Sequence, residues 1–93
     1  MVNMVIPMTT EGTIAQANVS QLVLPARGRR FLRVVSYGPS PMFVALGQAA
    51  EIGKGYYLLT QGADQVWATA VPASAVYIIC AVAGQAFAVE ESL

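Results

Sequence analysis

Residues 30–46 read RFLRVVSYGPSPMFVAL, two apolar runs separated by the turn sequence Gly-Pro-Ser-Pro. In the first run, Leu32 and Val34 fall on one face of an extended strand, while Arg33 and Val35 fall on the other. The Gly-Pro turn ends this strand, and the run 42–46 returns as a second one. The stretch therefore predicts a β-hairpin made of residues 30–37 and 42–46.

Turn-forming residues also interrupt the sequence on both sides of this stretch. Gly and Pro recur at short intervals, and the longest segment free of both is 13–24. Strands of five to seven residues fit between such breaks, whereas helices of average length do not. The segments themselves are rich in Val, Ile, Tyr, Phe and Thr, which favour strands. We expect strands at 2–8 (a strand or an arm), 13–19, 21–24, 30–37, 42–46, 56–60, 64–69, 75–81 and 85–90.

About eight short strands at roughly ten-residue spacing are typical of an all-β, antiparallel sandwich or barrel. Two further hairpins are expected, 56–60 with 64–69 and 75–81 with 85–90. The length of 93 residues fits one domain. We divide it into an N-terminal arm or edge strand, 1–12, and a single β-sandwich domain, 13–93. Residues 1–10 lack the basic region of a signal peptide, and no run is long enough for a transmembrane helix.

Charge is scarce in this sequence. It holds five basic and five acidic residues, with a formal net charge of zero and a hydrophobic fraction of 56%. A monomer of this mass would carry about one charge per 500 Å² of surface, by the usual scaling of surface with mass. Sparse charge and zero net charge favour association. We expect copies of the chain, or a partner, to cover a large part of the surface.

The composition also excludes most chemistry. There is no His, so a His-activated nucleophile, a His general base and a His metal ligand are all excluded. The single cysteine, Cys80, permits neither an intrachain disulfide nor a CxxC metal site. Glu90 and Glu91 are adjacent in a strand, so they face opposite ways and cannot act as an acid–base pair. We expect no enzyme, no cofactor and no metal, and we expect the carboxylates of Glu11, Glu51, Asp64, Glu90 and Glu91 to be solvated.

Four of the five basic residues fall within seven positions, at Arg27, Arg29, Arg30 and Arg33. They fit either contacts with an acidic partner surface or a solvated turn that leads into a strand. Nucleic-acid binding is disfavoured because the protein is neutral, with an isoelectric point near 6.1. Alternation predicts that Arg30 points outward and that Arg33 is partly buried beside a carboxylate.

Aromatic and apolar side chains supply the other candidate contacts. Tyr56 and Tyr57 are adjacent, so one ring must lie on each face of their strand. Together with Trp67 they are candidate interface anchors, since Tyr and Trp are common at interfaces. The turn that holds Pro39 and Met42 is expected to expose an apolar tip that docks on a partner.

A resemblance extends over about 20–89. It rests on the strand 29–35 followed by a Gly-Pro turn, on 42–47, on Gly55 with Leu58-Leu59, on 72–78, and on 84–86 before the last strand. This pattern resembles the small β-sandwich virion proteins of tailed bacteriophages, the capsid decoration or cement proteins. Residues 1–10 do not align with it.

The resemblance implies a jelly-roll sandwich that binds without catalysis. Such a protein is assembled in the host cytoplasm and sits on the outer surface of the phage head, usually as a homotrimer bound to the major capsid protein. It needs no cofactor, nucleic acid or membrane. Two alternatives stay open: a head or tail fibre module that binds a host receptor, and a small-ligand β-barrel in which Tyr56, Tyr57 and Trp67 line a pocket.

Overall fold

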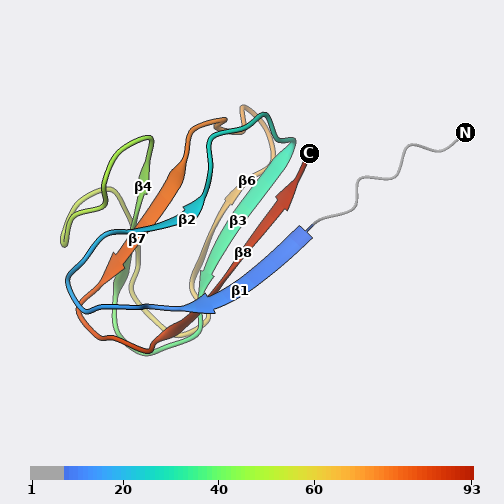
Figure 1. The fold of residues 1–93 in the computed structure, drawn as a ribbon. Coiled ribbons are helices and arrows are strands. Elements are labelled where there is room, and N and C mark those ends of the chain that lie inside the picture. The colour runs from blue at the N-terminus through green and yellow to red at the C-terminus, as the bar shows by residue number, and fades with distance from the viewer. Residues whose placement is uncertain (1–7) are drawn as a thin grey trace, which may run out of the picture.

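The computed structural model describes residues 8–93, and within them the chain forms strands and no helix (Figure 1). The all-β prediction is therefore confirmed for this part of the chain. The eight strands of the described residues are β1 (Met8–Thr13), β2 (Gln21–Leu24), β3 (Phe31–Ser36), β4 (Met42–Leu46), β5 (Tyr56–Leu58), β6 (Asp64–Trp67), β7 (Val76–Cys80) and β8 (Ala86–Ser92).

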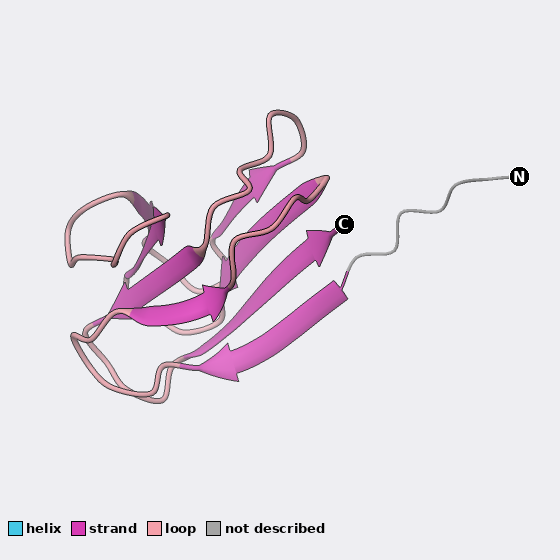
Figure 2. Cartoon of the chain, turned by 45° about the horizontal axis from the view of Figure 1, so that its top comes forward, coloured by secondary structure: helices cyan, strands magenta, loops and turns pink. Residues whose placement is uncertain are grey.

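These strands form two four-stranded antiparallel sheets, in the orders β1-β8-β3-β6 and β2-β7-β4-β5. We call them sheet A and sheet B. Figure 2 shows the two layers and the loops that join them. Consecutive strands lie in opposite sheets at every connection except β4 to β5, so the chain passes repeatedly from one layer to the other.

One hydrophobic core joins the two sheets, as in a β-sandwich. Alternation places Leu32 and Val34 of β3 on the inner face, and both are fully buried as expected. The opposite layer contributes Val44 of β4 and Ile78 of β7 to the same cluster. Both sheets thus supply buried side chains to the main cluster, which lies between the two layers.

The three expected hairpins are wrong. β3 and β4, β5 and β6, and β7 and β8 are each joined by a short turn, yet the members of each pair lie in different sheets. A strand with one apolar face can bury that face across the core as well as beside its neighbour. Alternation and turn composition therefore locate strands without saying which sheet each strand joins.

The turn between β3 and β4 is fixed by a buried glutamine from the turn before β8. The side-chain amide of Gln85 donates to Ser36 Oγ at 3.1 Å and to the Ser40 carbonyl at 2.7 Å. Its side-chain oxygen accepts from the Ser40 amide at 3.0 Å. Gly38 lies against the same side chain, and a Cβ there would overlap it. Two distant turns are thus locked together at one end of the sandwich.

The N-terminal part also differs from expectation. The predicted strand 13–19 is wrong, because β1 ends at Thr13 and the chain then turns, with Asn18 in the left-handed region at φ 60°. Glu11 lies within β1 and is exposed. The structure describes β1 as an edge strand that pairs with β8 from Met8 to Thr13. The predicted strand or arm at the very start of the chain lies, up to residue 7, outside the described residues.

Candidate functional site: the two outer faces of the sandwich

The most buried charge in the described chain is Arg29, at the entrance to β3. Its side chain is 0% exposed, and its Nε donates to Glu91 Oε2 at 2.9 Å. Its Nη1 donates to the carbonyls of Pro72 and Ser74, at 2.8 and 2.9 Å, and its Nη2 donates to the Pro25 carbonyl at 2.8 Å. One guanidinium thus ties the end of β8 to the segments that follow β2 and precede β7.

Arg27 shares this carboxylate, since it forms an ion pair with the other oxygen of Glu91. Burial lowers the pKa of the Arg29 guanidinium, and the positive charge of Arg27 lowers it further. Glu91 is 2% exposed, so the prediction of a solvated carboxylate is wrong at this position. Arg29 is likewise wrong as a partner contact, because all of its polar atoms are engaged inside the chain.

The other two arginines lie as the sequence predicts. Arg33 is partly buried on the outer face of sheet A, where its Nε donates to Asp64 at 2.8 Å and its Nη1 to Glu90 at 3.1 Å. The hydrogen bond with Asp64 is the main cause of its raised pKa. Arg30 is exposed and has no ion pair within the described chain. The four arginines therefore do not form one surface patch.

The candidate aromatic anchors separate into two places. Tyr56 and Trp67 meet edge to face, with ring centroids 5.1 Å apart, where β5 and β6 bridge the two sheets. Tyr57 points the other way, is 61% exposed, and lies beside Phe43 with ring centroids 6.5 Å apart. The pocket expected from Tyr56, Tyr57 and Trp67 is not formed, because the rings lie on opposite sides of β5.

The turn that holds Pro39 does not expose the apolar tip that was expected to include Met42. Pro39 is exposed, whereas Met42 is 0% exposed and belongs to the core. Met42 is the first residue of β4 and faces inward, opposite Leu58 of β5 and Cys80 of β7. The prediction that Met42 docks on a partner is therefore wrong.

Sheet B carries no charged side chain in any of its four strands. Its outer face holds a second, smaller hydrophobic cluster of Ala45, Ala50 and Ile79, with Phe43 and Tyr77 packed against it. Charged residues are the ordinary means of keeping such a face in water. The sheet instead presents an apolar outer face, which is typical of an interaction surface.

The loop 47–55 covers the middle of this face. Its Ala50 amide donates to Ser20 Oγ at 2.8 Å, which carries the loop from the end of β4 across to the start of β2. Around the loop, three large apolar side chains stay exposed: Leu22 at 54%, Ile52 at 45% and Tyr57 at 61%. Leu22 and Ile52 were missed in the sequence, where single apolar residues in a strand or loop carry no signal of exposure.

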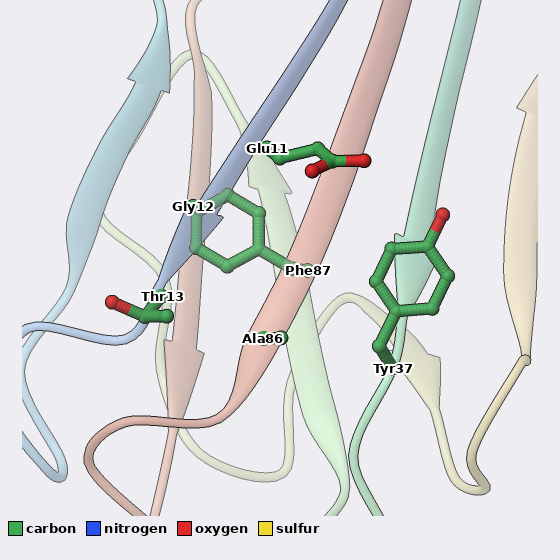
Figure 3. Close-up of a pocket in the computed structure, with 6 residues that line it drawn as sticks. All are labelled: Glu11, Gly12, Thr13, Tyr37, Ala86 and Phe87. Atoms are coloured by element: carbon green, nitrogen blue, oxygen red, sulfur yellow. The ribbon is translucent and has the colours of Figure 1, made fainter.

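The outer face of sheet A carries the charged side chains of Glu11, Arg33, Asp64 and Glu90 and contains a groove at one end (Figure 3). The groove has a volume of about 450 Å³. Glu11 of β1 and Tyr37 after β3 rise on either side of β8, with Ala86 low between them (Figure 3). Gly12, Thr13 and Phe87 complete the lining. Sequence reasoning missed this groove, because its two polar walls are 26 residues apart and meet only through pairing with β8.

Neither face brings together a reactive set. The described chain contains no group of three or more His, Cys, Asp or Glu side chains that could hold a metal ion. Cys80, the only cysteine, is fully buried in the core. No helix among residues 8–93 is long and apolar enough to cross a membrane.

Comparison with known protein families, with curated proteins and with solved structures finds no match to this chain. The arrangement itself therefore carries the functional argument. It offers two contrasting surfaces. The strands of sheet B carry no charge, and Glu51 and Lys54 lie in the loop that covers their outer face, whereas the outer face of sheet A carries charged side chains and a groove.

Proposed function

We propose that this chain is a jelly-roll module. A jelly roll has eight strands in two sheets, built from two Greek keys, and is common in viral capsid and lectin domains. The support is the strand order. Three of the four outermost pairings join strands distant in sequence, namely β1 with β8, β2 with β7 and β3 with β6, and the chain changes sheet at every connection except β4 to β5. The fold permits many functions, so the surfaces must decide among them.

Our proposed function is that of a non-enzymatic capsid decoration protein, which self-associates and binds the major capsid protein on the outer surface of a phage head. The observation that carries it is sheet B, whose strands carry no charge, with Leu22 and Tyr57 exposed on its outer face and Ile52 exposed in the loop 47–55 that covers that face. Such side chains act as desolvated anchors on an apolar surface. Repetition of one modest contact over a lattice gives avidity without a single tight site.

Stabilisation of the shell would follow from binding alone. A partner that binds only the intact shell stabilises it by RT ln(1 + [L]/Kd), or about 2.7 kcal/mol per site at a hundredfold excess over Kd. No bond is made or broken in this function. It therefore agrees with the lack of a His residue and with the buried, unreactive position of Cys80.

The test is thermal melting of heads purified without this protein, before and after the protein is added back. We expect the wild type to raise the melting temperature of the heads. Tyr57→Ser and Leu22→Ser should reduce this effect strongly, whereas Lys54→Ser should not, because Lys54 is a solvated rim charge.

If the protein leaves the melting curve of the heads unchanged and instead binds host cells, the receptor-binding alternative replaces this proposal. If the wild type and Tyr57→Ser stabilise the heads equally, the proposed function stands, but sheet B is not the surface that binds the shell.

A further inference from the structure

All ten charged side chains of the sequence lie in the described residues, and eight of them form ion pairs there. Within the described residues, one anion and one cation form no ion pair. The anion is Glu11, on a wall of the sheet A groove, and the cation is Arg30, exposed just before β3. One exposed charge of each sign therefore stays available for a contact between two copies of the chain.

The two groups cannot reach each other within one molecule. Glu11 pairs with Ala88 across the β1–β8 ladder, whereas Arg30 directly precedes Phe31, which pairs with Ser92. Five residue steps separate the two rows, or about 17 Å at the rise of an antiparallel strand. The β8 strand also lies between them. Glu11 and Arg30 thus mark opposite ends of the same sheet.

The groove has the chemistry of a guanidinium site. Glu11 offers a carboxylate that a guanidinium can engage through two hydrogen bonds. Tyr37 offers a ring face on which the same planar group can stack. The small side chain of Ala86 leaves the space between them open (Figure 3). The surrounding face adds a net charge of −1 to this attraction, because Asp64 and Glu90 share the one cation Arg33.

We propose that Arg30 of one copy of this chain occupies the Glu11–Tyr37 groove of the next copy. This inference rests on the proposed function for its premise of self-association, and it names the contact. The two surfaces are different parts of the molecule, so the contact is heterologous, head to tail. Such a contact closes into a ring when its rotation permits, which is how a trimer would form.

The experiment is a charge exchange followed by sedimentation equilibrium over a range of micromolar concentrations. Glu11→Arg and Arg30→Glu should each weaken self-association by at least about tenfold, since each places like charges together at the contact. The double variant Glu11→Arg/Arg30→Glu restores opposite charges and should return to within about threefold of the wild type. Thermal melting of each variant confirms that the fold is intact.

Matched controls separate this contact from a general effect of charge. Glu51→Arg and Lys54→Glu make the same charge changes at an exposed pair in loop 47–55 and should leave association unchanged. Ala86→Leu fills the groove without altering charge and should weaken association, whereas Ala83→Leu, at an exposed turn position, should not.

The inference is overturned if the wild type is a monomer at the highest concentration. It is also overturned if the double variant associates no more strongly than the single variant that associates least. Controls that weaken association as much as the groove variants also overturn it. The proposed function is judged separately, by the melting of heads. If the protein is a monomer and still stabilises heads, the proposed function stands and this contact is wrong. If the protein is an oligomer that responds to the charge exchange as expected but does not stabilise heads, this contact stands and the proposed function is wrong.

Discussion

Replacing Glu91 with Gln should destabilise the protein far more than the same change at Glu90, its neighbour in β8. Glu91 is the only carboxylate that compensates the fully buried Arg29, and it also pairs with Arg27. Removal of one partner from a buried ion pair costs about 3–5 kcal/mol, because it leaves an uncompensated buried charge. A chain of this length has a total stability of about 5–14 kcal/mol, so the variant loses a large share of it.

The neighbouring position provides the matched control. Glu90 pairs with Arg33, but this pair is partly exposed and Arg33 keeps Asp64 as a second partner. Glu90→Gln should therefore cost less than about 1 kcal/mol. Thermal unfolding should show a fall in Tm of more than about 12 °C for Glu91→Gln, at about 4–8 °C per kcal/mol, and a few degrees for Glu90→Gln. Equal shifts for the two variants would refute the reasoning from burial.

A double substitution tests the role of the three carbonyls around Arg29. In many proteins, a buried ion pair can be replaced by apolar residues without loss of stability. Here Arg29 also donates to the carbonyls of Pro25, Pro72 and Ser74. Arg29→Met/Glu91→Leu should therefore stay less stable than the wild type, since an acceptor that loses its donor where water does not reach it costs about 1–3 kcal/mol. Full recovery would show that the carbonyls find water or other donors.

Packing predicts three further outcomes. The first two are measured by urea or thermal unfolding, and the third is measured by thiol titration. Gly38→Ala should cost about 1–3 kcal/mol, because the new Cβ overlaps a buried side chain held by three hydrogen bonds, whereas Gly28→Ala meets nothing and should be neutral. Met42→Ala should cost about 2–5 kcal/mol as a core truncation, and Tyr57→Ser much less because that ring is largely exposed. Cys80 should resist a thiol reagent in the native protein and react on unfolding; rapid native reaction would contradict its burial.

The positions of the strands could be predicted because Gly and Pro interrupt the chain at its real turns. The expected strands 21–24 and 42–46 match β2 and β4 to the residue. The pairing of strands could not be predicted in the same way. The Gly38–Pro41 turn has the composition of a hairpin, yet a glutamine from another turn, Gln85, holds it as a passage between sheets.

The burial of Arg29 and Glu91 could not be predicted from local sequence patterns either. Arg33 was placed correctly because its position in a strand forces it to the face opposite Leu32 and Val34. Arg29 precedes the strand, so alternation says nothing about it, and its partner Glu91 lies 62 residues away. The groove between Glu11 and Tyr37 depends in the same way on the register of β1 and β3 against β8.

The central place of β8 in sheet A has a consequence for synthesis on the ribosome. β1 and β3 both pair with β8 and have no ladder with each other, so β1 stays unpaired until residues 86–92 have been made. Until then, the inner faces of both sheets lack much of their cover, because Phe87 and Val89 come from the same strand. Formation of sheet A is therefore postponed until β8 has been made, and folding is dominated by contacts distant in sequence, which makes it slow. A truncation before β8 would remove the centre of a sheet rather than an edge, and would leave a chain prone to aggregation.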